Sequence, residues 1–179
     1  MRPKQGELFG NFPLEYGGDK SVGRRKTMRP FDRKRAVHAT FRATKAVGAW
    51  SMHHKRHKGL VYGLAEEIAL ESNIRLYCVV NVGNHIHVVL KARSRREFQR
   101  FLRVFGGRIA MLVTGARKGR PVSKAGERFW DLPVHTKIIS FGEQWDRLKK
   151  YMAKNLYEAE GAGAKLVMPS FEIHSAAPS

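Results

Sequence analysis

Residues 74–91 read Ile-Arg-Leu-Tyr-Cys-Val-Val-Asn-Val-Gly-Asn-His-Ile-His-Val-Val-Leu-Lys, and this stretch decides the fold. Two apolar runs, 74–82 and 85–91, are joined by a short link that contains glycine, which is the pattern of a β-hairpin. Side chains alternate between the two faces of a strand, so His85 and His87 point to the same side, roughly 7 Å apart along the strand. The opposite, core-facing side carries Ile86, Val88 and Leu90.

The period of the apolar residues predicts the elements around this hairpin. The first is a strand from Ala36, followed by a helix that ends at Asn73 and has the apolar positions Leu60, Val61, Leu64, Ile68 and Leu70. After the two hairpin strands comes a helix opened by the Ser94–Glu97 capping box. A strand at 134–140 and a helix at 143–159 complete the order. The first six form a split βαβ, ferredoxin-like α+β fold, βαββαβ, with an antiparallel central sheet. The C-terminal helix is an addition to it. The first and third strands are central in this arrangement, so the histidine pair lies mid-sheet.

Composition limits the partner and the compartment. The chain of 179 residues has 34 Lys and Arg against 15 Asp and Glu, a net charge of +19, which favours DNA or RNA first and an acidic membrane surface second. No apolar stretch is long enough to span a bilayer, so we expect no membrane partner. The single cysteine, Cys78, predicts a reducing, cytoplasmic compartment. The expected organisation is a basic, flexible arm (1–34), one catalytic domain (35–160) and a tail (161–179).

The C-terminal helix places two polar side chains together. Tyr151 and Asn155 are four residues apart and share a face beside the apolar stripe, so both can face the histidines. Asn155 offers an oxygen ligand for a metal, and Tyr151 a nucleophile. A phenol attacks weakly unless a metal or base assists it, yet it leaves phosphorus readily, so a phosphotyrosine link is reversible. This chemistry suits an enzyme that cuts DNA and rejoins it.

Two runs of the sequence are similar to a known family. The run 77–91 with its His-Ile-His segment, and the run 127–130 followed by a strand and Tyr151-Met-Ala-Lys-Asn155, resemble the HUH single-tyrosine transposases, in particular the REP-associated tyrosine transposases and related insertion-sequence transposases. The match covers about residues 35–160. Gly83 and Leu156 stand where proline is common in the family, which weakens the subgroup assignment more than the chemistry.

The resemblance implies a metal-dependent transesterase that acts on single-stranded DNA, often within or beside a hairpin. Tyr151 would attack a phosphodiester, forming a 5′-phosphotyrosine intermediate and freeing a 3′-hydroxyl. His85, His87 and Asn155 would hold Mg²⁺ or Mn²⁺. The protein would be a monomer or homodimer in the bacterial cytoplasm, held at the nucleoid by DNA.

Clusters of cations predict where DNA phosphates bind. Residues 91–108 carry a net charge of +6, which is dense for a solvated helix face, and a second cluster lies in the Gly-rich segment 115–126. The candidate DNA-binding residues are Arg95, Arg96, Arg100, Arg103, Arg117, Lys118, Arg120 and Lys149. The histidines His53, His54 and His57 are at most part of a surface that faces nucleic acid.

Plainer interpretations remain open. The histidine pair can be two polar residues on the solvent face of a strand, and Tyr151 an amphipathic residue at the core edge. Tyr157 is a rival nucleophile, although it points roughly opposite to Asn155 around the helix. The chain can also be a domesticated relative that cleaves or only binds DNA. A further alternative is a non-catalytic ferredoxin-like module that binds single-stranded nucleic acid, which would present exposed aromatic side chains where this chain has histidines.

Overall fold

The structure is a computed structural model and describes residues 14–23, 27–117 and 128–161. Its elements are β1 (Glu15–Tyr16), η1 (Gly18–Ser21), β2 (Ala36–Arg42), η2 (Gly48–Trp50), α1 (Lys58–Glu71), β3 (Ile74–Asn81), β4 (His85–Ala92), α2 (Arg95–Thr114), β5 (His135–Ile139) and α3 (Glu143–Glu160). From β2 to β5 this is the predicted βαββαβ order, and α3 is the predicted addition. None of the described helices is both long and apolar enough to cross a membrane.

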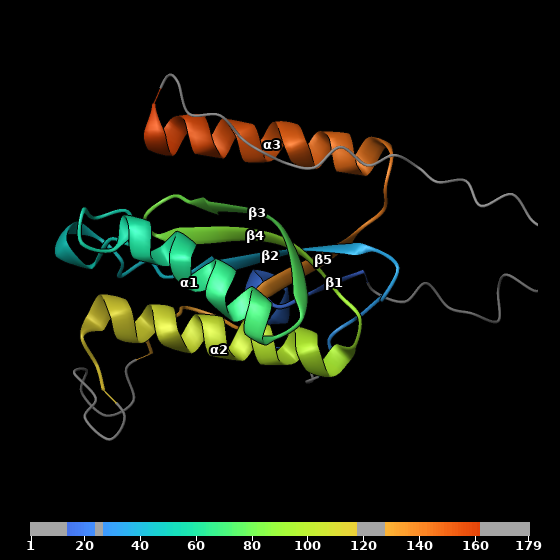
Figure 1. Ribbon diagram of the computed structural model, residues 1–179, viewed down its shortest axis with the longest axis horizontal. Helices are drawn as coiled ribbons and strands as arrows, with labels where there is room; N and C mark the ends of the chain where they lie inside the picture. The colour runs from blue at the N-terminus through green and yellow to red at the C-terminus, as the bar shows by residue number, and fades with distance from the viewer. Residues whose placement is uncertain (1–13, 24–26, 118–127, 162–179) are drawn as a thin grey trace, which may run out of the picture.

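The strands form one antiparallel sheet in the order β1-β5-β2-β4-β3. Helices α1 and α2 cover one face of this sheet, and α3 lies on the other (Figure 1). Strands β2 and β4 are neighbours near the centre, with His87 opposite Thr40 and His85 opposite Arg42. The α+β, ferredoxin-like prediction is therefore confirmed, and so is the mid-sheet position of the histidine pair.

The larger core lies between the sheet and the helices α1 and α2 (Figure 1), and α2 contributes the aromatic side chains Phe98, Phe101 and Phe105 to it. Helix α2 begins at the predicted capping box, in which the Glu97 backbone N–H donates to Ser94 Oγ (3.2 Å) and the Ser94 N–H donates to the Glu97 carboxylate (2.9 Å). The helix runs unbroken through Gly106, where a Cβ would lie 3.3 Å from the ring of Phe41. Trp130 Nε1 donates to the Gly106 carbonyl at 2.9 Å. Glycine at this position thus serves close packing and not a bend.

A smaller core lies between the sheet and α3. The buried stripe of α3 consists of Trp145, Leu148, Met152, Asn155 and Leu156. Its apolar members pack against side chains of β3 and β4, among them Tyr77, Val80 and Val89. Because the helix lies over that half of the sheet, the polar face of β2 and β5 stays uncovered beside it.

The described part of the N-terminal segment packs against the edge of the sheet. Strand β1 pairs with β5 and adds a fifth strand that the sequence pattern did not predict. Arg29 stacks on the ring of Tyr16, with its guanidinium carbon 4.4 Å from the ring centroid, and donates to Val134 O and Thr136 Oγ1. Residues 1–13 and 24–26 of the predicted arm, and the tail from residue 162, lie outside the described part.

Candidate functional site

A cleft of about 1370 Å³ lies beside α3, over the polar face of β2, β4 and β5. Its lining includes the predicted residues His85, His87 and Tyr151. It also includes side chains that the sequence analysis did not assign to a site, namely His38, Thr40, Arg42, His135, Lys137 and Arg147.

The two predicted histidines lie side by side in this cleft. Their ring centroids are 4.8 Å apart, and the rings are perpendicular at 89°. His87 is 2% exposed, whereas His85 is half-buried at the start of β4. The prediction that both side chains leave the strand on the same face, opposite to the core residues, is confirmed.

Hydrogen bonds occupy the same nitrogen, Nδ1, of each ring. Nδ1 of His85 lies 2.6 Å from Asn84 Oδ1. Nδ1 of His87 lies 3.1 Å from His38 Nε2 and 3.3 Å from Thr40 Oγ1. The other nitrogen of His87, Nε2, is buried and has no hydrogen-bond partner in the described part of the chain. A buried polar atom without a partner is costly, so its position suits a ligand atom.

The surroundings keep the histidines neutral. Burial, reinforced by His38 and His85, lowers the pKa of His87 to about 3. Burial and the charges of His135 and Lys137 lower the pKa of His38 to about 4. Burial, with Arg42 nearby, also lowers the pKa of His85. Neutral imidazole is the form that binds a metal ion.

Tyr151 reaches this pair from α3. Its ring centroid is 5.4 Å from that of His87, edge-on at 84°, and 6.1 Å from that of His38. The residue is 46% exposed, so a ligand in the cleft can approach it. Tyr157, the rival nucleophile, is 59% exposed and does not line the cleft. The structure thus brings Tyr151, and not Tyr157, to the histidines.

Asn155 is buried at the core edge one turn beyond Tyr151. Its Nδ2 donates to the backbone carbonyl of Tyr151 at 2.8 Å, which uses the amide nitrogen and not the oxygen that a metal would need. Within the described residues, no group of three His, Cys, Asp or Glu side chains is placed to hold a metal ion. A metal at His85 and His87 would therefore take its third protein ligand from another side-chain type, such as this amide.

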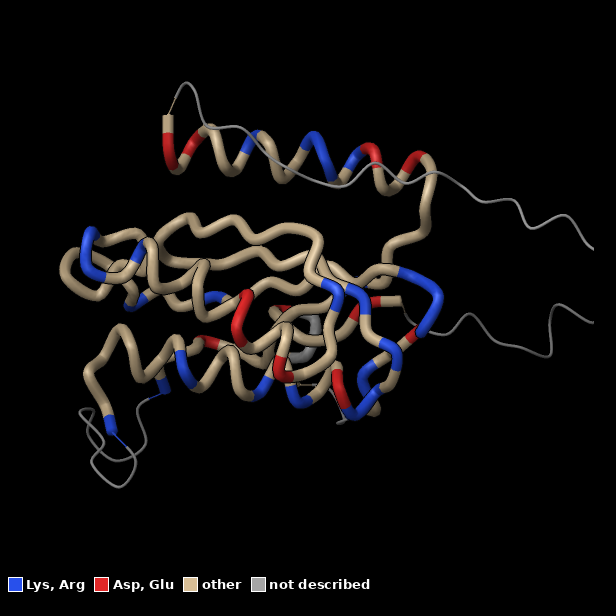
Figure 2. The backbone as a smooth tube through the Cα atoms, in the orientation of Figure 1, with Lys and Arg blue, Asp and Glu red and all other residues tan. Residues whose placement is uncertain are grey.

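The predicted DNA-binding cations that the structure describes do not line the cleft. Arg96, Arg100 and Arg103 are exposed on α2, which covers the opposite face of the sheet (Figure 2). Arg95 donates to the Arg29 carbonyl and lies over the ring of Phe31. Lys149 pairs with Asp146, and Arg117 is exposed beyond the end of α2. Lys118 and Arg120 lie outside the described residues.

The cations that do line the cleft are Arg42, Lys137 and Arg147. The position of Arg42 on this face could have been predicted from the sequence, because Arg42 alternates with the core residues of β2 and so lies on the same side as His38. Lys137 follows the same rule on β5. The alternation along the strands does not predict where α3 lies on the sheet. The position of α3 turns this side of the sheet into one wall of a cleft.

The comparison with solved structures finds distant likenesses. No protein-family model matches the sequence, and no curated protein matches it. One of the distant likenesses is to a solved structure described as "a putative transposase from Deinococcus radiodurans R1". The superposed region covers 74% of this chain and 98% of that chain, with 12% sequence identity and a TM-score of 0.40. A likeness this distant does not carry an activity over to this chain.

Proposed function

We propose that this protein is a metal-dependent transesterase that nicks and rejoins single-stranded DNA through Tyr151. The observation that carries the proposal is the contact of Tyr151 with His87, a neutral histidine whose Nε2 is buried without a partner in a cleft lined by cations. A nucleophile, a candidate metal ligand and phosphate-binding groups then lie within one site.

The histidine pair fits a divalent cation. With Nδ1 of each ring held by a neighbour, Nε2 is the nitrogen left for a metal, as is usual for metal-binding histidines. His85, His87 and Asn155 would hold Mg²⁺ or Mn²⁺, and two nitrogen ligands suit Mn²⁺ better, since Mg²⁺ takes oxygen ligands. Such an ion would polarise the scissile phosphate and stabilise the charge that develops there.

Tyr151 performs the exchange of ester bonds. Its phenol oxygen forms a bond to phosphorus while the bond from phosphorus to the 3′-oxygen breaks, and the phenol proton ends on the freed 3′-hydroxyl. The product is a 5′-phosphotyrosine. Attack by a 3′-hydroxyl reverses the step and releases the tyrosine, so strands are rejoined without a further source of energy.

The cleft cations position the substrate. Arg42, Lys137 and Arg147 would contact phosphates on either side of the scissile bond. The half-exposed face of Tyr151 leaves room for an unpaired strand in the cleft beside α3. A hairpin stem next to that strand would stay outside the cleft.

The test uses labelled single-stranded hairpin DNAs with Mn²⁺ and detects an adduct that resists SDS. Tyr151→Phe should abolish the adduct, whereas the matched control Tyr157→Phe, on the same helix but outside the cleft, should retain it. EDTA or His87→Ala should remove it as well. An adduct in Tyr151→Phe would disprove the nucleophile, and undiminished adduct from His87→Ala in EDTA would disprove the metal role.

A second candidate is a protein that binds single-stranded nucleic acid without cutting it, as a domesticated relative would. The observation in its favour is that Asn155 does not line the cleft, and that no three His, Cys, Asp or Glu side chains of the described residues are grouped to hold a metal ion. Tight, salt-dependent binding of hairpin DNA with no adduct at any Mn²⁺ concentration would favour this candidate.

A further inference from the structure

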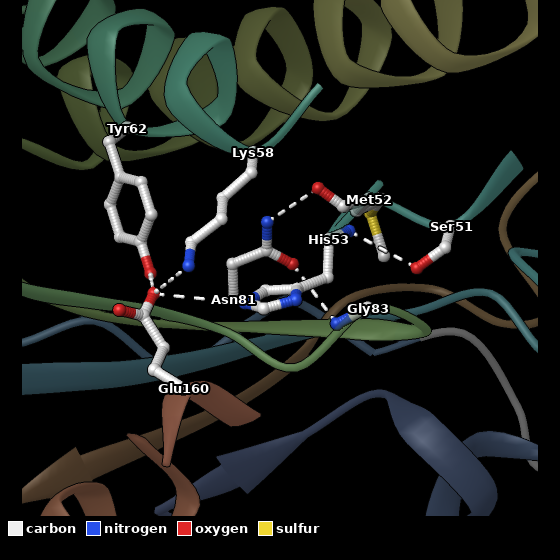
Figure 3. Close-up of polar contacts among 8 residues, drawn as sticks. All are labelled: Ser51, Met52, His53, Lys58, Tyr62, Asn81, Gly83 and Glu160. Atoms are coloured by element: carbon white, nitrogen blue, oxygen red, sulfur yellow. Dashed lines mark hydrogen bonds and ion pairs between the residues drawn. The ribbon is translucent and has the colours of Figure 1, made fainter. Parts of the chain in front are cut away.

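The Glu160 carboxylate joins the C-terminal end of α3 to residues 53–62. Oε1 of Glu160 accepts a hydrogen bond from the Tyr62 hydroxyl at 3.1 Å and lies 3.3 Å from Lys58 Nζ and 3.7 Å from His53 Nε2 (Figure 3). Burial alone would raise the pKa of Glu160, but hydrogen bonds from Lys58 and Tyr62 outweigh it and lower the pKa. The carboxylate is therefore charged near neutral pH and bound by donors from a different part of the fold.

The segment that binds Glu160 also holds the turn before His85. Met52 N–H donates to the Gly83 carbonyl at 2.8 Å, and Asn81 Nδ2 donates to the Met52 carbonyl at 2.6 Å. Gly83 has a φ of 95°, and a Cβ there would lie 2.9 Å from Ser51 Oγ, so the two segments are in close contact. Residues 51–62 thus join the turn that precedes the histidine strand β4 to the helix that carries Tyr151.

We propose that Glu160 is a positioning residue, which sets the distance from Tyr151 to the histidines by holding α3 on residues 51–62. This inference rests on the proposed role of Tyr151. Counted from Glu143, where α3 begins, Tyr151 is 8 residues along the helix and Glu160 is 17. If α3 pivots at its start, a shift of about 2 Å at Glu160 moves Tyr151 by about 1 Å. A misplacement of that size costs about 100-fold in rate.

The experiment compares Glu160→Gln with the matched control Glu158→Gln. Glu158 is exposed and pairs only within α3, with Lys154 at 3.7 Å, in the described part of the chain. The first readout needs no DNA: NMR records the shift that the Tyr151 ring imposes on the ring protons of His87. The second is the rate of adduct formation at saturating hairpin DNA with Mn²⁺, and the third is the Kd for that DNA.

We expect Glu160→Gln to reduce the NMR shift and to slow adduct formation at least tenfold, while the Kd changes less than twofold. The charge exchange Lys58→Glu with Glu160→Lys should restore both the shift and the rate. Glu158→Gln should match the unaltered protein.

Equal NMR shifts in Glu160→Gln and Glu158→Gln would overturn the inference, and so would an undiminished rate of adduct formation at saturating DNA in Glu160→Gln. If the unaltered protein forms no adduct, the proposed function fails. The NMR shift and its recovery in the charge exchange then decide the positioning role alone.

Discussion

Acid should destabilise the metal-free protein, and His87 should account for a defined part of the effect. Burial, with His38 and His85 nearby, lowers the pKa of His87 to about 3, whereas an unfolded histidine titrates near 6.5. Between these two values the unfolded chain binds a proton that the folded chain does not. The free energy of unfolding therefore rises with pH in this window. The contribution of His87 is complete above pH 6.5 and is lost as the pH falls towards 3.

The size of the effect follows from the same pKa values. A pH of 5 is about 1.5 units below the pKa of an unfolded histidine, and each unit corresponds to about 1.4 kcal/mol. His87 therefore lowers the free energy of unfolding at pH 5 by about 2 kcal/mol. His38, with its pKa lowered to about 4 mainly by burial, adds a similar term. The two rings are in hydrogen-bond contact at 3.1 Å, so the terms are coupled and their sum is an upper limit of about 4 kcal/mol.

The assay is urea unfolding in EDTA at pH 7, 6 and 5, followed by tryptophan fluorescence. Between pH 7 and pH 5, His87→Gln should lose about 2 kcal/mol less than the unaltered protein. His54→Gln, in the loop outside the cleft, serves as the control and should follow the unaltered protein. Parallel curves for His87→Gln and the unaltered protein would refute the conclusion that His87 is held neutral by burial.

Three further outcomes are expected. Ser94→Ala, which removes the capping box of α2, should lower the free energy of unfolding by about 1 kcal/mol in urea titrations. Gly106→Ala should destabilise by about 1 kcal/mol in the same assay, because crowding Phe41 costs 1–3 kcal/mol while the gain in helix propensity is at most about 1 kcal/mol. Arg42→Ala should slow adduct formation and lower the salt slope of hairpin binding by less than one, because Arg42 is already paired with Asp131. Arg100→Ala, on the opposite face, should leave the adduct rate unchanged.

The fold was predictable where the sequence repeats a pattern, and less so elsewhere. The hairpin strands carry strong periods and were predicted to within one residue at each end, and the start of α2 was predicted from its capping box. Helix α1 was found, but Leu60 and Leu70, assigned to its apolar positions, are exposed. Its buried face uses Ala65 and Ala69 together with larger residues, because the helix packs closely on both β3 and α2. Strand β1 has two residues, which is too short for any period to be visible.

The site was predictable where its residues are near in sequence. Strand alternation puts His85 beside His87, and helical spacing puts Asn155 next to Tyr151. His38 was missed as a partner of His87 because 49 residues separate them, and only the register between β2 and β4 brings them to 3.1 Å. Pairing between distant strands is a tertiary property, so local pattern gives the face of His38 and not its neighbour.

Net charge predicts a polyanionic partner but does not identify the face that binds it, because some of the cations are already paired with carboxylates. The cations of the cleft are an example. Each cleft cation has an acidic neighbour: Lys137 lies 2.8 Å from Glu15, Arg42 lies 4.0 Å from Asp131, and Arg147 contacts Glu143. Exposed ion pairs of this kind contribute about 0–1 kcal/mol, so a phosphate can replace the carboxylate at small cost. Each replacement exchanges one anion for another and releases fewer counterions than a solvated cation would. The salt slope of binding should therefore be set more by the exposed arginines of α2, and the rate of chemistry more by the paired cations of the cleft.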